Sequence, residues 1–309
     1  MRSMKVVLLA LLVTVPTLGS AQAATADAPS PTSVKAVLVT GASTGIGRNL
    51  TEHLAARGHF MYAGARKPAD LEALAAIKNV QAIRLDVTKQ EDVDAAVATI
   101  TKAGRGLYGL VDNAGVATVG PLAETSMEDF AFVMDVNLYG PLRVTKAFMP
   151  LIVASKGRIA TIGSISGILA SRDLTAYAMS KHAIEAFTDS LAAQMAPLEV
   201  KVSVIEPGNY DSDIGKSASK RSGKESRFSD RSKYKKPDEV SAAVEQALFD
   251  ANPKRRYMVV PEQREAEITI RKQIEQLVQL NEGQPYAYDR EALIKMLDEA
   301  LAAARPPAK

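Results

Sequence analysis

The sequence contains no cysteine, and this absence excludes several kinds of site. A chain without thiols forms no disulfide, has no thiolate nucleophile and holds no zinc ion through sulfur. Only three histidines are present, His53, His59 and His182, and their spacing is not that of a metal site. Neither sign of charge is in large excess, because the net charge is only +3 over 309 residues. We therefore expect neither a bound metal nor a nucleic-acid partner.

A hydrophobic run long enough to cross a bilayer is likewise missing near the N-terminus. The apolar stretch from Val6 to Val15 has ten residues, whereas a spanning helix needs roughly 20. Arg2 and Lys5 precede it and Ala21-Gln22-Ala23 follows, which is the order of a secretory signal peptide. We expect cleavage after Ala23, export to the periplasm and no stable membrane span afterwards; a cytoplasmic location and an uncleaved membrane anchor are the alternatives. Residues 24–33 are predicted to be a polar linker.

After residue 33, short apolar runs alternate with segments of helical periodicity. Strands are predicted at 34–39, 60–65, 82–85, 107–111, 158–162, 200–205 and 257–260. Helices are predicted at 46–57, 70–77, 91–101, 126–137, 139–154 and 177–195. Strands separated by helices of about 10–15 residues are typical of βαβ units and a parallel sheet. We therefore expect an α/β fold, a Rossmann-type doubly wound parallel sheet in a single domain over 34–260, with ligands beyond the carboxyl ends of the strands.

Two regions depart from this alternation. Residues 211–236 are polar and rich in lysine and arginine, and we interpret them as a substrate loop, either a closing lid or a solvated connection. Residues 261–309 are predicted to form a helical C-terminal extension, with two amphipathic helices between 262 and 304. These helices can cover the substrate pocket, form a subunit contact or pack on the domain, and the sequence leaves these three roles open.

A glycine-rich turn follows the first predicted strand directly. Gly41, Gly45 and Gly47 are spaced G-x-x-x-G-x-G, and a helix is predicted to begin at the same point. Glycine lets the backbone approach a phosphate closely, and N–H groups at a helix N-terminus bind anions. The turn is therefore a candidate site for the pyrophosphate of a dinucleotide, although such glycine clusters also occur in ordinary turns.

The end of the second predicted strand discriminates between the two nicotinamide dinucleotides. An acidic residue there binds the ribose of NAD, whereas an arginine accommodates the 2′-phosphate of NADP. The strand ends in Ala65-Arg66-Lys67, and no acid occurs before Asp70. Arg66 is thus a candidate ligand for that phosphate, and we predict NADP as the cofactor rather than NAD. A pair of cations that are merely solvated is the alternative.

Tyr177 and Lys181 are four residues apart in a predicted helix, so their side chains share one face. A free phenol is a poor base at neutral pH because its pKa is about 10. A neighbouring ammonium and an oxidised nicotinamide lower that pKa, which makes Tyr177 a candidate acid/base for an alcohol and carbonyl pair. Ser164, just after another strand, is a candidate hydrogen-bond donor to the substrate oxygen. An isolated Tyr-x-x-x-Lys pair is also frequent on helix surfaces.

Taken together, these motifs resemble the short-chain dehydrogenase/reductase family. The matching segments, in family order and spacing over about residues 34–260, are Thr40-Gly41-Ala42-Ser43-Thr44-Gly45-Ile46-Gly47, Leu85-Asp86-Val87-Thr88, Asp112-Asn113-Ala114-Gly115, Asn137, Ser164, Tyr177-Ala178-Met179-Ser180-Lys181 and Pro207-Gly208. The resemblance is greatest to the branch that contains 17β-hydroxysteroid and retinol dehydrogenases. Two positions depart from the family pattern, since Asp112 replaces a frequent Asn and Ser212 a frequent Thr.

The resemblance implies a role for each matching position. The catalytic residues would be Asn137, Ser164, Tyr177 and Lys181, with Asn137 positioning a water that relays protons through Lys181. The cofactor-binding residues would be Gly41, Ser43, Thr44, Gly45, Ile46, Gly47, Arg66, Asp86, Val87, Asn113, Ala114, Gly115, Tyr177, Lys181, Pro207, Gly208 and Ser212. Among them, Asp86 would bind the adenine, Lys181 the nicotinamide ribose, and Pro207-Gly208 would lie against the nicotinamide ring. A purely structural Asn137 is the alternative.

The expected function is therefore hydride transfer between NADP(H) and an apolar alcohol or ketone, with Tyr177 as the general acid/base. The resemblance also implies a homodimer or homotetramer built from helices 139–154 and 177–195. A Rossmann domain can instead serve as a cofactor sensor or a scaffold without catalysis. Such proteins usually lose part of the Ser, Tyr and Lys set, which is complete here.

Overall fold

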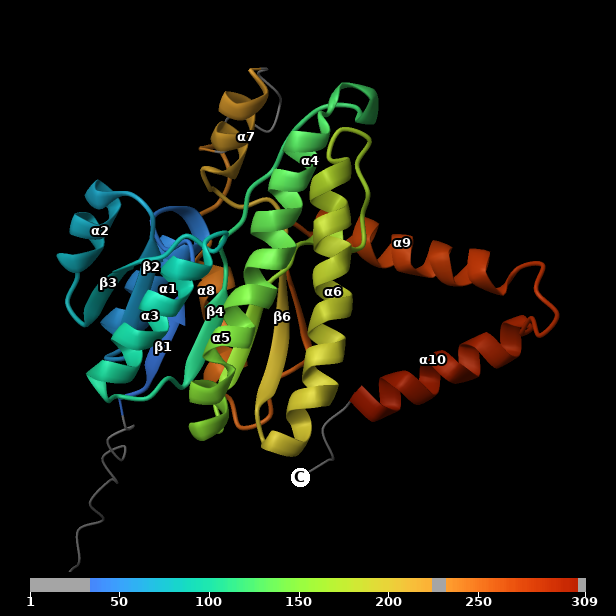
Figure 1. The fold of residues 1–309 in the computed structure, drawn as a ribbon. Coiled ribbons are helices and arrows are strands. Elements are labelled where there is room, and N and C mark those ends of the chain that lie inside the picture. The colour runs from blue at the N-terminus through green and yellow to red at the C-terminus, as the bar shows by residue number, and fades with distance from the viewer. Residues whose placement is uncertain (1–33, 224–231, 305–309) are drawn as a thin grey trace, which may run out of the picture. The chain divides into compact units, whose positions relative to one another are not determined.

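The structure is a computed structural model in which residues 34–223 and 232–304 are described (Figure 1). Seven parallel strands form one sheet in the order β3-β2-β1-β4-β5-β6-β7. Their bounds are β1 (Ala36–Val39), β2 (Phe60–Ala65), β3 (Val80–Arg84), β4 (Gly109–Asp112), β5 (Arg158–Ile162), β6 (Lys201–Pro207) and β7 (Arg256–Val259). The winding direction reverses between β1 and β4. Ligands of doubly wound sheets bind at such a reversal, beyond the carboxyl ends of the strands.

Helices cover both faces of this sheet. Their bounds are α1 (Gly45–Ala56), α2 (Pro68–Ala75), α3 (Gln90–Ala103), α4 (Met127–Met134), α5 (Gly140–Ala154), α6 (Thr175–Met195), α7 (Ile214–Ser222), α8 (Asp238–Phe249), α9 (Gln263–Asn281) and α10 (Arg290–Ala304). Shorter turns are the 3-10 helices η1 (Leu122–Glu124), η3 (Ile165–Gly167) and η4 (Ala196–Leu198) and the π-helix η2 (Asp135–Tyr139). Residues of α3, α5 and α6 pack on one face, and residues of α1, α2 and α8 on the other. The predicted Rossmann-type doubly wound α/β fold is therefore confirmed.

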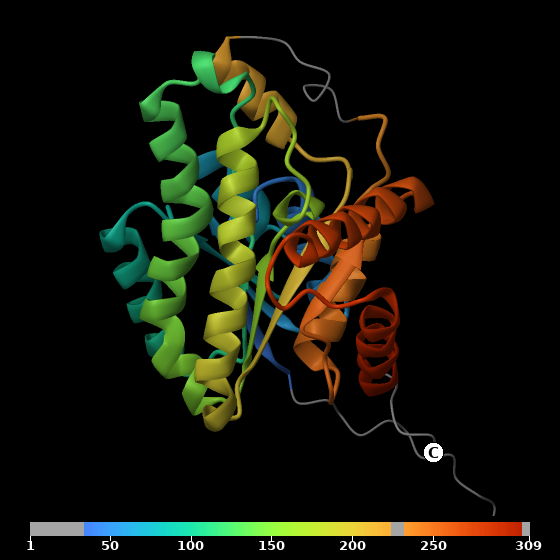
Figure 2. The same cartoon turned by 90° about the vertical axis from the view of Figure 1, so that its right-hand side faces the viewer.

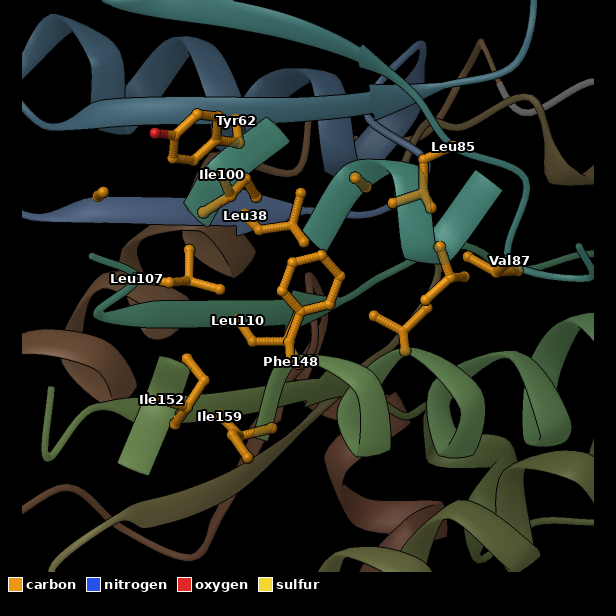
Figure 3. Packing of buried hydrophobic residues seen from close by; sticks show 14 of the residues in the cluster. Leu38, Tyr62, Leu85, Val87, Ile100, Leu107, Leu110, Phe148, Ile152 and Ile159 are labelled. Carbon is orange, nitrogen blue, oxygen red and sulfur yellow. The ribbon is translucent and has the colours of Figure 1, made fainter. Parts of the chain in front are cut away.

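The two cores share the strands between them. Figure 3 shows one core, in which Phe148 of α5 and Ile100 of α3 lie against Leu38 and Leu110 of the sheet. All four side chains are fully buried. Val37, the neighbour of one of these strand residues, points into the other core, because successive side chains of a strand alternate between the faces. Strands buried on both faces are apolar at every position, which explains the short continuous apolar runs in the sequence.

The predicted elements up to β6 agree with the structure to within a few residues at each end. Beyond β6 two helices were not predicted. The interpretation of 211–236 as a loop is wrong over α7, where Ala218 is buried and the lysines occupy the outer faces; residues 224–231 lie outside the described residues. In α8, Val240, Val244 and Leu248 are fully buried at four-residue intervals, which is a regular helical pattern.

The N-terminal predictions fall outside the structure. The proposed signal peptide and linker occupy residues 1–33, none of which is among the described residues. Within 34–223 and 232–304, no helix combines the length and the apolar character that crossing a membrane requires.

The two predicted C-terminal helices are present as α9 and α10, the red helices at the end of the chain in Figure 1 and Figure 2. The residues predicted to share an apolar face of α9 are Ile270, Ile274, Leu277 and Val278. Each of them is about half exposed, from 51% to 55%. The apolar face of α9 is therefore only partly covered by the rest of the domain.

Candidate active site

The glycine-rich turn between β1 and α1 has a conformation that depends on glycine. Gly41 and Gly45 have φ angles of +64° and +55°, a region that strains residues with a Cβ. A Cβ on Gly47 would lie 2.4 Å from both the Asn113 Nδ2 atom and the Gly41 carbonyl oxygen. Thr44 precedes α1 without a side-chain capping bond, and the first turn of α1 carries no acid. The N–H groups at this helix terminus are therefore suited to an anion such as a pyrophosphate.

Asn113 joins this turn to the end of β4. Its Nδ2 donates to the carbonyl oxygens of Thr40 and Gly41 at 2.8 and 3.0 Å. The Thr40 hydroxyl accepts the backbone N–H groups of Asn113 and Ala114 at 2.9 and 3.0 Å. A Cβ on Gly41 would lie only 2.8 Å from the Ala114 Cα. The glycine-rich turn and the predicted cofactor-binding segment after β4 thus form one hydrogen-bonded unit, in which Thr40 is a link that had no predicted role.

Arg66 and Asp86 lie just past the ends of the neighbouring strands β2 and β3. The Arg66 Nη1 atom is 3.9 Å from Asp86 Oδ2, and Asp86 Oδ1 accepts the N–H and the hydroxyl of Thr88 at 3.0 and 2.7 Å. Burial raises the pKa of Asp86, but the bonds from Thr88 and the charge of Arg66 outweigh it and hold this pKa below its usual range. Val87, predicted with Asp86, is buried against Gly140. The exposed Arg66 guanidinium therefore extends beside a charged carboxylate at the strand ends.

Tyr177 and Lys181 lie in the first half of α6, and Ser164 lies just past β5. The Lys181 Nζ atom is 5.6 Å from the centroid of the Tyr177 ring and donates to the Ile162 carbonyl oxygen at 2.7 Å. Because Ile162 is the last residue of β5, this bond fixes Lys181 beside the segment that carries Ser164. The buried Ser164 hydroxyl accepts the Ser166 N–H at 3.0 Å, which leaves its own proton to donate.

Two opposing effects set the pKa of Lys181. Burial lowers the pKa of Lys181 to about 8, while the negative charge of Glu185 raises it. The ammonium is therefore still largely charged at neutral pH. Lys181 therefore places a positive charge beside the Tyr177 ring.

Asn137 lies in the π-helical turn η2, between α4 and α5. Its Oδ1 accepts the Val116 N–H at 2.8 Å, and its Nδ2 donates to the Val116 carbonyl oxygen at 2.8 Å and to the Ser180 hydroxyl at 3.0 Å. The side chain thus joins the segment after β4, which includes Gly115, to α6 beside Lys181. Single π-helical turns inside helices are frequent at functional sites. Asn137 remains a predicted catalytic residue, placed next to the predicted pair.

The Pro207-Gly208 turn at the end of β6 is contacted by a residue that was not predicted. Glu265, in the first turn of α9, accepts the Asn209 N–H on Oε2 at 3.0 Å and the Asn209 Nδ2 on Oε1 at 2.7 Å. A Cβ on Gly208 would lie 1.9 Å from the Glu265 Oε2 atom. A glycine is therefore required where the carboxylate packs. No local sequence pattern relates two positions that lie 56 residues apart in the chain.

Ser212 lies close to the glycine-rich turn. Its Cβ is 3.0 Å from the position that a Cβ on Gly45 would occupy. The segment after β6 therefore meets the N-terminus of α1, where Ser43, Thr44 and Ile46 also lie. This contact brings the predicted pyrophosphate site and the predicted cofactor-binding residue Ser212 together.

The sequence also gave no role to two neighbouring carboxylates, one of which acts on Lys181. Glu185 follows Lys181 by one turn of α6, and Glu206 lies in β6 with 2% exposure. The four-residue spacing of Tyr177, Lys181 and Glu185 is visible in the sequence. The proximity of Glu206 is not, because it depends on how α6 packs on the sheet.

The residues of this edge fit a nicotinamide dinucleotide. The turn excludes side chains where a phosphate needs backbone N–H groups, and Arg66 provides a cation at the end of β2. Lys181 and Tyr177 lie across the same edge, beyond β5. Among residues 34–223 and 232–304, no three histidine or acidic side chains gather as metal ligands. The arrangement can hold an extended dinucleotide, with Tyr177 as the predicted acid/base beside it.

The chain is similar to known dehydrogenases. A family model described as short chain dehydrogenase matches residues 35–223. The mitochondrial D-beta-hydroxybutyrate dehydrogenase of Bos taurus is 43% identical over 190 residues, which are 58% of this chain and 55% of that protein. Retinol dehydrogenase 5 of Mus musculus is 38% identical over 185 residues, or 58% of each chain. The chain thus spans about half the length of the curated relatives it matches.

A solved structure extends the likeness over most of the fold. The short-chain dehydrogenase of Burkholderia cenocepacia J2315, determined in complex with NADP, has a TM-score of 0.65 to this chain at 26% identity. The match covers 82% of this chain and 98% of the other. The similarity therefore includes both halves of the doubly wound sheet.

Proposed function

The chain belongs to the short-chain dehydrogenase family, and from this premise we propose that it is an NADP(H)-dependent oxidoreductase of an alcohol and carbonyl pair, with Tyr177 as general acid/base. One observation carries the proposal. A buried Lys181 ammonium lies 5.6 Å from the Tyr177 ring and is held by the last carbonyl of the strand that precedes Ser164. This arrangement favours a phenolate next to a hydroxyl donor, at the edge of the sheet where a dinucleotide binds.

Each side chain then has a defined task. A nicotinamide dinucleotide, when bound, would supply the hydride chemistry. Tyr177 takes the alcohol proton at its phenolic oxygen during oxidation and returns it during reduction. Ser164 donates a hydrogen bond to the substrate oxygen and orients it. Lys181 keeps the phenol acidic enough to work near neutral pH, because its positive charge stabilises the phenolate.

Arg66 supports NADP as the cofactor. Its guanidinium is 57% exposed and extends past β2, where the 2′-phosphate of NADP lies in doubly wound folds. Replacing Arg66 with Ala removes a charge-assisted hydrogen bond, so we expect the Kd for NADPH to rise roughly tenfold or more. The Kd for NADH, which has no 2′-phosphate, serves as the internal control and should stay unchanged. Equal weakening of both cofactors, measured by nicotinamide fluorescence, would contradict the role of Arg66.

The relatives suggest two chemical classes of substrate. One is named for retinol, an apolar alcohol, and the other for a short hydroxy acid. We propose an apolar alcohol or ketone, since the resemblance in sequence is to the branch that acts on such molecules. A panel of apolar ketones and aldehydes, with retinal and acetoacetate included, distinguishes the two classes through loss of the NADPH absorbance. Turnover restricted to acetoacetate would overturn the apolar assignment.

The test of the mechanism is Tyr177→Phe. We expect this change to lower kcat by at least about a hundredfold, since it removes the acid/base, while the Kd for NADPH stays within a factor of two or so. Tyr286→Phe is the matched control, because Tyr286 is 81% exposed in the segment between α9 and α10. Unchanged turnover in Tyr177→Phe would exclude the mechanism. Tight NADPH binding without turnover on any substrate would favour a cofactor sensor or scaffold instead.

Two properties of the whole protein are also proposed. Export is proposed from the N-terminal sequence pattern, and a mature N-terminus at Ala24 in a periplasmic fraction would test it. Self-association is proposed through α5 and α6, where Leu142, Met149, Phe187 and Leu191 line an apolar hollow of about 230 Å³. A sedimentation measurement that finds only monomer would refute it.

A further inference from the structure

A pair of carboxyl groups begins one helical turn past Lys181, on the side away from Tyr177. Glu185 occupies the next turn of α6, and its side chain is 13% exposed. Glu206, in β6, has a side chain that is only 3% exposed. The Oε1 atoms of both carboxyl groups are buried and accept no hydrogen bond from the described donors. A proton on one carboxyl would supply the missing donor for the other.

Arg256 of β7 closes this pair on the solvent side. Its Nε atom is 3.1 Å from Glu185 Oε2 and 3.5 Å from Glu206 Oε1. Its Nη1 and Nη2 atoms donate to Asp189 at 3.0 and 2.7 Å, so a single guanidinium faces three carboxyl groups. If Glu185 and Glu206 share one proton, the three carboxyl groups together carry two negative charges. These balance the positive charges of Arg256 and Lys181.

The Glu185 carboxyl also packs under the segment that carries Ser164. A Cβ on Gly163 would lie 3.1 Å from Glu185 Oε1, and a Cβ on Gly167 would lie 2.9 Å from the same atom. These glycines lie on either side of Ser164. Ile162, whose carbonyl oxygen accepts the Lys181 ammonium, directly precedes Gly163. The carboxyl therefore contacts the backbone that positions Ser164 and lies next to the acceptor of Lys181.

The electrostatics of the pair agree with this geometry. Burial raises the pKa of Glu185, and burial together with the neighbouring Glu185 charge raises that of Glu206 to about 8. Two carboxyl groups in contact ionise in separate steps, and the raised pKa of Glu206 makes it the member that holds its proton at neutral pH. The charged and titratable groups that face the pair are Lys181 and Asp189 from α6 and Arg256 from β7. Arg255 faces only Asp189.

We propose that Glu185 is a positioning residue for Lys181: paired with Glu206 through one proton, it places a single negative charge behind the ammonium and supports the Ser164 segment. Glu206 holds the proton and so keeps Glu185 the charged member. The importance of Lys181 for turnover rests on the proposed function. The charge relation between Glu185 and Lys181 is a property of the folded chain and can be measured without a substrate.

The experiment compares two isosteric variants, Glu185→Gln and Glu206→Gln. The full chain is labelled with ¹³C at the lysine ε carbon, and the NMR titration of Lys181 is followed, with its signal assigned by its loss in Lys181→Arg. In the unaltered protein we expect titration near about 8. Glu185→Gln should lower the midpoint by on the order of one pH unit, because the ammonium loses its nearby anion. Glu206→Gln mimics the protonated member and should leave the midpoint within a few tenths of a unit.

Two further variants distinguish a positioning role of Glu185 from an effect on folding alone. Asp189→Asn, one turn further along α6 and 53% exposed, should leave the Lys181 midpoint unchanged. Glu185→Asp keeps the charge but withdraws it by one methylene, so the midpoint should fall less than in Glu185→Gln. An unmoved midpoint in Glu185→Gln, or equal shifts in Glu185→Gln and Glu206→Gln, would overturn the proposal. If Glu185→Gln does not fold, Glu185→Asp carries the test, and an unmoved midpoint there has the same meaning.

Turnover gives an independent measurement. If a substrate is found, the alkaline limb of the pH profile of kcat/KM should move to lower pH in Glu185→Gln and not in Glu206→Gln. A purely structural role would lower kcat at every pH without moving that limb. A protein that turns over no substrate but shows the shifted Lys181 titration would refute the proposed function and leave the Glu185 proposal standing.

Discussion

Asp112 shows how one buried side chain makes stability depend on pH. The residue ends β4, and Thr145 Oγ1 donates to its Oδ2 at 2.8 Å, while its Oδ1 has no partner among the described residues. Burial raises its pKa from 3.8 to about 7, and the bond from Thr145 offsets this only in part. Between these values the folded protein keeps a proton that the unfolded chain has released. The free energy of unfolding therefore falls as pH rises from about 4 to about 7.

Replacing Asp112 with Asn should remove this dependence. Asn is neutral at every pH and keeps an oxygen to accept the Thr145 hydroxyl. We expect the variant to be more stable than the unaltered protein at pH 8, by on the order of 2 kcal/mol. The difference should vanish towards pH 4, and chemical denaturation at several pH values measures it. Asp298→Asn, on the exposed face of α10, is the control, and a gain that is constant with pH would contradict this account.

The residues of the site fall into two groups, according to whether local sequence or tertiary packing brings them to their partners. Gly41, Gly45 and Gly47 could be predicted because a local backbone requirement fixes their spacing. Tyr177 and Lys181 could be predicted because one turn of helix relates them. Glu206 and Glu265 could not be predicted, because their partners lie on other elements and depend on tertiary packing. These two carboxylates show no periodicity with the residues they contact.

At the scale of elements, hydrophobic periodicity was enough to predict the strands and helices wherever short apolar runs alternate with segments of helical spacing. The strands β2 and β5 coincide with their predicted bounds. The helix α8 was missed although its buried face is regular, because it follows a long basic segment that suggested a loop. The helix α7 was missed because it has little apolar surface of its own and its polar residues dominate the sequence pattern. Charge composition thus concealed α8, which local spacing supports, and α7, which it does not.

The contact between α9 and the end of β6 gives a prediction at this scale. In Gly208→Ala the new methyl group meets the Glu265 carboxylate, so the carboxylate must leave Asn209. We expect a loss of about 1–3 kcal/mol in the free energy of unfolding. In a Glu265→Ala background the same substitution has room, so its cost should be smaller by 0.5 kcal/mol or more. A double-mutant cycle by chemical denaturation measures this coupling, and equal costs in both backgrounds would show that the contact does not matter.

At the scale of the whole molecule, a single sheet carries both cores. Ile152 of α5 lies in the core on one face, and Ile205 of β6 contributes to the core on the other; both are fully buried. Because the strands between the faces belong to both cores, the domain should unfold in one transition. Loss of one core would expose the strands that the other needs.

Changing each isoleucine to Val tests this cooperativity. Each substitution should reduce the free energy of unfolding by about 0.5–1.5 kcal/mol. The double variant should lose the sum to within about 0.5 kcal/mol, since the two sites lie on opposite faces. Denaturation followed both by circular dichroism and by tyrosine fluorescence should give coincident curves. Separate transitions, or a loss seen by one probe only, would mean that the two faces unfold independently.

The two hydrogen bonds that Glu265 accepts from Asn209 also link movement of α9 to movement of the turn after β6. Both carboxylate oxygens are engaged at the first turn of α9, while the helix continues to Asn281. At 1.5 Å of rise per residue, a tilt of about 5° at Glu265 displaces the far end by about 2 Å. A spectroscopic label at the distal end of α9 would therefore register small movements of the turn that is predicted to lie against the nicotinamide ring.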